Sequence, residues 1–95
     1  MFVIELVYKV PLQEIDAQMK SHMVFLNKYY KSGNFICSGR KVPRNGGIIV
    51  AQAKDKKAME KIMKQDPFYK NQLADFTITE FLASQKIPLL KEIII

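Results

Sequence analysis

The stretch from Phe2 to Val10, FVIELVYKV, decides the fold of this chain. Its β-branched and aromatic residues favour a strand, which Pro11 ends. A strand that is buried on one face alternates apolar and polar residues, whereas this stretch is almost continuously apolar. We therefore expect both of its faces to be covered. The stretch Ile48–Ala51, IIVA, has the same character and predicts a strand of the same kind.

The apolar residues between Leu12 and Lys31 recur at steps of three and four, which predicts one amphipathic helix. The predicted apolar stripe consists of Leu12, Ile15, Met19, His22, Leu26 and Tyr29, widened by Met23 and Tyr30. Gly33 follows the helix and is expected to end it in a left-handed conformation.

The later segments alternate between strand-like and helix-like composition and are bounded by turn residues. They are a strand at 34–39, a basic loop at 40–46, the strand at 48–51, a helix from Asp55 to Lys64, a connecting turn at 68–73 and a strand at 76–81. Asp55 is expected to cap this helix and Asp66-Pro67 to end it, because the residue before a proline disfavours helical backbone. The order βαββαβ predicts an α+β, ferredoxin-like fold: an antiparallel four-stranded sheet with two helices on one face.

Two helices cover only one face of such a sheet, so the second face must be buried by something else. A second copy of the chain is the simplest candidate, and we expect a homodimer with its sheets packed face to face. Residues 1–82 form the predicted domain. The apolar extension 83–95, which ends LLKEIII, is expected to add an edge strand to the same chain or to act as an arm on a partner.

Composition excludes several classes of site. The 95 residues include 15 Lys and Arg against nine Asp and Glu, and this net charge of +6 suits acidic partners without selecting among them. A single cysteine, Cys37, excludes an internal disulfide and is expected to be a buried, inert thiol among apolar neighbours. A single histidine excludes a multi-histidine metal site, and we expect no metal and no cofactor.

The sequence also predicts where the protein works. No apolar run approaches the roughly 20 residues that a membrane-spanning helix needs. The start of the chain, MFVIE, lacks the basic segment that opens a signal peptide. We therefore expect a cytoplasmic protein with no membrane partner.

His22, the only histidine, lies on the apolar stripe of the first helix. It is either a core histidine bonded to the backbone or a general acid or base that faces a cleft. Asp66 extends the buried side of the second helix, where a carboxylate is costly to bury without a partner. His22 could be that partner. The alternative is an Asp-Pro turn that only terminates the helix.

A second group of candidates surrounds the basic loop. Arg40, Lys41 and Arg44 adjoin Asn45-Gly46-Gly47, where guanidinium and exposed backbone N–H groups could hold an anion. A solvated hairpin loop is the alternative interpretation. Ser38, with Gly39 beside it, could place a hydroxyl at the mouth of the same pocket.

Four short motifs, in this order and spacing, resemble the pattern of the YciI-like (YCII-related) proteins: His22, Ser38-Gly39, Arg44-Asn45-Gly46-Gly47 and Asp66-Pro67-Phe68. The resemblance covers residues 2–82 and implies a ferredoxin-like fold that dimerises into an α+β barrel. It also implies that His22 and Asp66 form a catalytic pair facing a pocket between sheet and helices. Related barrels include muconolactone isomerases and a dehydrochlorinase of a hydroxylated chloroaromatic ring. The chain departs from the pattern at Arg40, where a proline is common, which suggests a different loop path and a more anionic ligand.

These features lead to one main functional hypothesis. We expect a small acid–base enzyme, a cofactor-independent isomerase or lyase that acts on a small anionic cyclic or aromatic compound. His22 would move the proton and Asp66 would orient the imidazole. The expected ligand contacts are Arg44 and Arg40 for a carboxylate or phenolate, with Ser38 and the Gly47 N–H as further polar contacts.

Two other classes of function fit parts of the sequence. The first is a non-catalytic dimer that binds or senses a small molecule in the same pocket. The second is a nucleic-acid module, which would suit the fold and the charge. Against it, the strand GIIVA at 47–51 offers no aromatic side chain on which a base could stack, so we do not expect a nucleic-acid partner.

Overall fold

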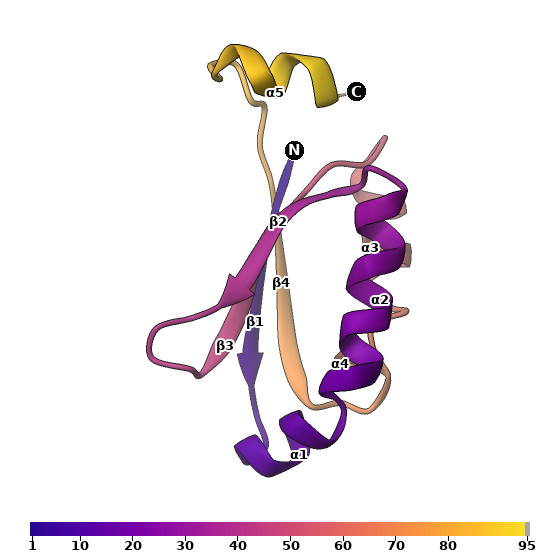
Figure 1. Cartoon of the computed structure of the whole chain (residues 1–95), viewed down its shortest axis with the longest axis vertical. Helices are drawn as coiled ribbons and strands as arrows, with labels where there is room; N and C mark the ends of the chain where they lie inside the picture. Colours follow the sequence, from indigo (N-terminus) through magenta and orange to yellow (C-terminus); the bar gives the residue numbers. More distant parts are fainter. Residues whose placement is uncertain (95) are drawn as a thin grey trace.

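The computed structural model describes residues 1–94, which form one four-stranded sheet with helices packed on one face (Figure 1). In chain order the elements are β1 (Phe2–Tyr8), α1 (Leu12–Ala17), α2 (Met19–Lys31), β2 (Phe35–Arg40), β3 (Gly46–Ala51), α3 (Lys56–Met63), α4 (Pro67–Lys70), β4 (Ala74–Glu80) and α5 (Pro88–Ile93). The strands are antiparallel in the order β2-β3-β1-β4. This is the ferredoxin-like order, so the predicted fold is confirmed. In the described part of the chain, no helix is long and apolar enough to cross a membrane.

The side chains of β1 point alternately toward two different environments. Phe2, Ile4 and Leu6 face the helices and are at most 2% exposed. The intervening residues lie on the opposite face, together with every second residue of β3. We call this surface the open face, because α2, α3 and α4 all lie on the other side of the sheet (Figure 1). Its apolar members are Val3, Val7, Ile48 and Val50.

The core lies between the sheet and the helices α2, α3 and α4. The aromatic rings of Phe25, Tyr29 and Phe35 contact one another, with centroids 5.4–5.6 Å apart. Phe25 was not part of the predicted stripe but is buried, whereas Leu12, at 42% exposed, is not. The reason is that the predicted helix is broken at residue 18, so that α1 crosses the end of the sheet and only α2 runs along it (Figure 1).

Most of the predicted boundaries and caps agree with the structure. Gly33 has a φ of +84°, as expected for the residue that ends α2. The Asp55 side chain accepts a hydrogen bond from the Ala58 N–H at 2.8 Å and caps α3. The segment expected as a connecting turn at 68–73 begins instead as the short helix α4, capped by Asp66.

The expectation that Cys37 is buried was wrong, because the side chain is exposed. β2 lies at the edge of the sheet, and its register with β3 shifts between Phe35 and Cys37. Cys37 therefore lies opposite Val50 on the open face. Apolar neighbours in the sequence do not reveal such a shift of register.

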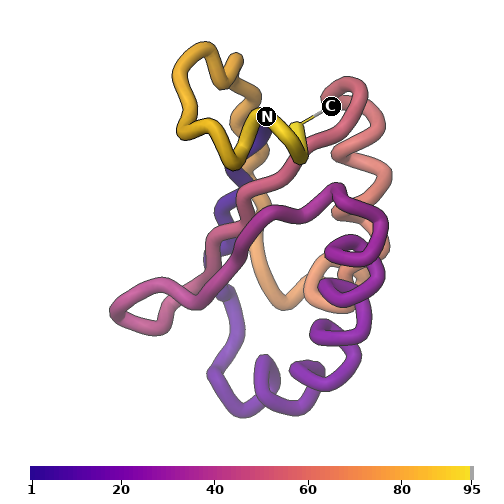
Figure 2. Tube along the Cα trace, turned by 45° about the horizontal axis from the view of Figure 1, so that its top comes forward, coloured from indigo at the N-terminus to yellow at the C-terminus, as the bar shows by residue number. Residues whose placement is uncertain are grey.

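The apolar tail was expected to add an edge strand, and within the described residues it does not pair with the sheet. It forms α5 at the end of the sheet that carries the N-terminus (Figures 1 and 2). Pro88 opens this helix; it has no N–H to donate to a strand ladder but fits a first helical turn. The buried Gln52 side chain donates to the Ile93 carbonyl at 2.7 Å and holds α5. Ile95 lies outside the described residues.

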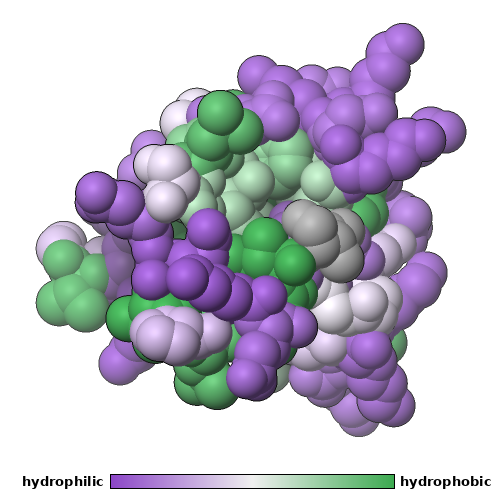
Figure 3. All heavy atoms as spheres, turned by 90° about the horizontal axis from the view of Figure 1, so that it is seen from above, coloured by the Kyte–Doolittle hydropathy of each residue, from purple (hydrophilic) through white to green (hydrophobic). Residues whose placement is uncertain are grey.

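Several apolar side chains of the tail remain in contact with solvent. Leu82, Ile87 and Leu89 are 89%, 62% and 66% exposed. Seen from the end of the molecule that carries α5, apolar side chains lie exposed among hydrophilic ones (Figure 3). An arm that reaches a partner subunit therefore stays a prediction.

Gly46→Ala is expected to destabilise the fold, because a Cβ at this position would lie 1.8 Å from the carbonyl oxygen of Leu6. β3 would have to move away from β1, and we expect the free energy of unfolding to fall by about 1–3 kcal/mol. Gly39→Ala is the matched control, since a Cβ there meets nothing within 4 Å. Its effect should stay within about 0.5 kcal/mol. Urea denaturation measures both variants, and equal stability of the two would contradict this account.

Candidate active site

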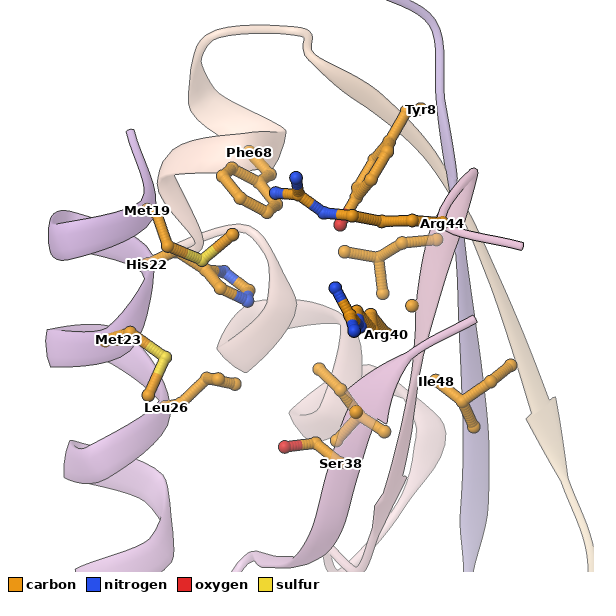
Figure 4. Close-up of a pocket in the computed structure, with 14 residues that line it drawn as sticks. Tyr8, Met19, His22, Met23, Leu26, Ser38, Arg40, Arg44, Ile48 and Phe68 are labelled. Atoms are coloured by element: carbon orange, nitrogen blue, oxygen red, sulfur yellow. The ribbon is translucent and has the colours of Figure 1, made fainter. Parts of the chain in front are cut away.

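A pocket of about 410 Å³ opens between α2 and the face of the sheet that carries the helices (Figure 4). This volume suits a small organic ligand. Strand alternation brings polar side chains to its wall. Tyr8 is in phase with the buried residues of β1, while Ser38 and Arg40 of β2 lie opposite Ile49 and Gly47 of β3.

His22 and Asp66 form a buried pair on the helix side of the pocket. Their Nδ1 and Oδ1 atoms are 2.9 Å apart, and the Asp66 side chain is fully buried. A carboxylate only accepts hydrogen bonds, so with Asp66 ionised the Nδ1–H of His22 donates. Asp66 does not line the pocket, whereas the imidazole of His22 lies at its wall and points into the cavity (Figure 4). Nε2 is then the ring nitrogen that can form a hydrogen bond with a ligand.

The Asp66 carboxylate has a second structural role, as the cap of α4. Oδ1 also accepts a hydrogen bond from the Phe68 N–H at 2.9 Å, and Pro67 occupies the first helical position. Oδ2 is buried and has no hydrogen-bond partner among residues 1–94. A buried carboxylate that lacks part of its hydrogen bonding is costly for folding. Such groups occur at sites that use charge in chemistry.

Phe68 packs against the flat face of the His22 imidazole. Its ring stacks on that of His22 with centroids 4.1 Å apart and an interplanar angle of 5°. The Tyr8 ring packs edge-on against the same Phe68 at 6.1 Å. The Asp66-Pro67-Phe68 motif thus supplies both the hydrogen bond and the stacking contact that orient His22.

Arg44 connects the loop after β2 to α1 and to β1. Its guanidinium donates to the Asp16 carboxylate, and its positive charge acts on the Tyr8 hydroxyl. The hydrogen bond from Arg44 lowers the pKa of Asp16 below its ordinary range. Burial raises the pKa of Tyr8 above its ordinary value of 10.0, while the Arg44 cation opposes that shift.

Sequence reasoning missed Tyr8 and Asp16 as neighbours of the site. The alternation in β1 contains a signal for Tyr8, because this residue is in phase with Leu6 and must face the helices. No pattern in the sequence places Asp16 next to Arg44. That contact arises where α1 crosses the end of the sheet.

The other predicted residues lie around the same cavity. The Ser38 hydroxyl is hydrogen-bonded to the Tyr30 hydroxyl at 2.5 Å. Arg40 is exposed at the end of β2 and makes no ion pair with any residue in the range 1–94. Of the predicted residues, His22, Ser38, Arg40, Arg44 and Gly47 line the pocket, whereas Asp66 and Lys41 do not. The described residues contain no cluster of His, Cys, Asp and Glu that could hold a metal ion.

Two solved structures share this fold at low sequence identity. One is 5-chloro-2-hydroxyhydroquinone dehydrochlorinase from Burkholderia phenoliruptrix AC1100 in complex with 2,5-dihydroxybenzoquinone. It matches with a TM-score of 0.71 and 15% identity over 86% of this chain and 94% of that one. The other is SnoaB, a cofactor-independent oxygenase from Streptomyces nogalater, with a TM-score of 0.51 and 16% identity over 92% of this chain and 94% of its own.

No curated protein matches the sequence. The family model of the YCII-related domain matches residues 1–82, which include the four strands and every residue of the candidate site. The match covers most of the chain and agrees with the motifs that surround the pocket. The chain therefore belongs to the YCII-related family.

Proposed function

We propose that the protein is a small acid–base enzyme of isomerase or lyase type that uses no cofactor. Its substrate would be a small anionic cyclic or aromatic compound. The observation that carries this proposal is the buried His22–Asp66 pair, joined at 2.9 Å, at the wall of a pocket of suitable size. A histidine whose second nitrogen is bound to a buried carboxylate is arranged as a general base.

In the proposed reaction the proton moves through one nitrogen of His22. Nδ1–H donates to Asp66 Oδ1, so the lone pair of Nε2 can take a proton from the ligand. The imidazole then carries a positive charge, which the buried Asp66 carboxylate stabilises. The same nitrogen returns the proton in the second half of an isomerisation or to the leaving group of an elimination. The stack on Phe68 keeps the ring in place through both steps.

The walls of the pocket support the proposed ligand class. Met19, Leu26 and Phe68 provide apolar surface for a ring, and two arginines provide positive charge. Arg44 is neutralised in part by Asp16, so Arg40 is the cation with more charge to offer a carboxylate or phenolate. The neighbouring structure with 2,5-dihydroxybenzoquinone supports a ring with acidic oxygens as the first compound to test.

His22→Ala is expected to lower proton transfer by about a hundredfold or more, because a general base contributes about that much. The measurement is turnover and solvent-deuterium uptake across a panel of small aromatic and lactone acids. Added imidazole should restore part of the rate. Asn27→Ala, an exposed position on the same helix, is the control.

Asp66→Asn should lower the rate of the same proton transfer, because it removes the negative charge that stabilises the imidazolium. The amide oxygen still accepts from the Phe68 N–H, so the melting temperature should change little.

Two outcomes would redirect this proposal. Equal binding and turnover in wild type and His22→Ala would remove His22 from the mechanism. Binding that needs Arg44 but survives substitution of His22 and Asp66, with no turnover of any compound, would favour the non-catalytic binding protein.

We also propose that two copies of the chain pack through their open faces. Val3, Val7, Ile48 and Val50 place apolar surface there, beyond what one chain can bury. The charge at the centre of this face, Glu5, is already paired with Lys41 at 2.8 Å. A partner would therefore not bury an uncompensated carboxylate. The exposed apolar tail could add to the same contact as an arm.

Val3→Lys is expected to turn the dimer into a monomer, because an ammonium group on each copy would have to be buried in the interface. Val24→Lys is the control, since Val24 lies on α2, away from the open face, and is already 67% exposed. Light scattering at micromolar concentration measures the mass of each protein. A monomeric wild type would contradict the proposed dimer.

A further inference from the structure

We propose that Tyr8 is a second catalytic residue of this pocket, which donates a hydrogen bond to the ligand oxygen that becomes negatively charged. The substrate class is then narrowed to small cyclic compounds with an acidic C–H bond. This bond lies next to a carbonyl group or next to a C=C bond that is conjugated with the carbonyl group. The proposal rests on the proton transfer proposed above for His22 and assigns the group that receives the resulting charge.

The Tyr8 hydroxyl and the His22 imidazole are placed so that both can contact one ligand. Tyr8 ends β1, and its hydroxyl points into the cavity from the sheet side, whereas His22 lies on the helix side (Figure 4). Both rings contact the same Phe68, one edge-on at 6.1 Å and the other stacked at 4.1 Å. Because Phe68 is itself fixed in the core, the distance between phenol and imidazole is set by packing.

The hydrogen bonding of Tyr8 leaves its proton for the ligand. A tyrosine hydroxyl has one donor and also accepts hydrogen bonds. The guanidinium of Arg44 has donors only, so its interaction with Tyr8 leaves the phenol proton unused. Arg44 is held in turn by Asp16 from α1. The O–H bond of Tyr8 can therefore turn toward a ligand oxygen, with the guanidinium close by to stabilise negative charge.

The charges around Tyr8 keep the phenol protonated at neutral pH. Burial raises its pKa, and the carboxylates of Asp16 and Asp66 raise it further. Arg44 acts in the opposite direction but does not overcome these effects. His22 faces the same cavity from α2. A neutral phenol beside a cation is a donor for an oxyanion, in the way that oxyanion-stabilising groups act in acid–base enzymes.

The chemistry of the proposed step is balanced without a co-reactant. Nε2 of His22 takes a proton from a ring carbon, and the electron pair of the C–H bond forms a C=C bond. The π electrons of the carbonyl group move to its oxygen, which accepts the hydrogen bond from Tyr8. The imidazolium then returns the proton to another carbon of the conjugated system, and the C=O bond forms again. The product is an isomer of the substrate.

The direct test is binding of 2,5-dihydroxybenzoquinone, a coloured ring compound with acidic oxygens. Tyr8→Phe removes only the hydroxyl and should weaken binding by about tenfold, as expected for a lost hydrogen bond to a charged group. Tyr69→Phe is the matched control, because Tyr69 packs on Phe76 and does not line the pocket. Wild type and Tyr69→Phe should bind the quinone equally well.

A second measurement needs no ligand. The difference between the ultraviolet pH titrations of wild type and Tyr8→Phe isolates the ionisation of Tyr8. We expect a pKa above the ordinary 10.0. Arg44→Ala should raise this pKa further, since it removes the cation that favours the phenolate. A Tyr8 that ionises below the ordinary value, or that does not respond to Arg44→Ala, would overturn the proposed donor.

The results separate this inference from the proposed function. If Tyr8→Phe binds the quinone as wild type does, or if wild type does not bind it at all, the role of Tyr8 is refuted. If His22→Ala abolishes deuterium uptake while Tyr8→Phe changes neither uptake nor binding, the function of His22 stands and Tyr8 has no part in it. If Tyr8→Phe weakens binding but His22→Ala has no effect on uptake, the oxyanion site stands and the proposed catalysis fails.

Discussion

The hydrogen bond between Asp66 and His22 is the interaction on which the site depends. The two residues are 44 positions apart in the sequence, and the bond joins α2 to the start of α4 inside the core. The same carboxylate oxygen caps α4 and thereby places Phe68 against the imidazole. Because Asp66 is fully buried and one of its oxygens has no partner among the described residues, the pair concentrates negative charge beside a single titratable ring.

The sheet provides the other half of the pocket through strand alternation. The side of β1 that carries Leu6 builds the core and, at its end, presents Tyr8 to the cavity. The side that carries Val3 and Val7 builds the open face. One apolar strand can thus serve a ligand pocket on one face of the sheet and the proposed subunit contact on the other, because its side chains alternate between the two.

Much of the fold and part of the site could be predicted from local patterns. The order of strands and helices followed from changes of period, and the Asp55 cap and the Gly33 terminus followed from backbone chemistry. The closeness of His22 and Asp66 could be suspected because His22 lies on the buried side of its helix and Asp66 extends the buried side of the next one. The break between α1 and α2, the exposure of Cys37 and the helical tail could not, since they depend on where the chain must cross or pair with the sheet.

By itself, the sequence determined which faces of each element are apolar, and therefore the ferredoxin-like architecture and the surplus of apolar surface on the first and third strands. It also determined which groups were available for chemistry, namely one imidazole and a few carboxylates and guanidinium groups. Only the tertiary structure decided that Arg44 pairs with Asp16 and acts on the charge of Tyr8, and that Tyr8 faces His22 across a cavity. Periodicity reports the face on which a residue lies, whereas contacts between distant segments depend on how helices, loops and strands pack in three dimensions.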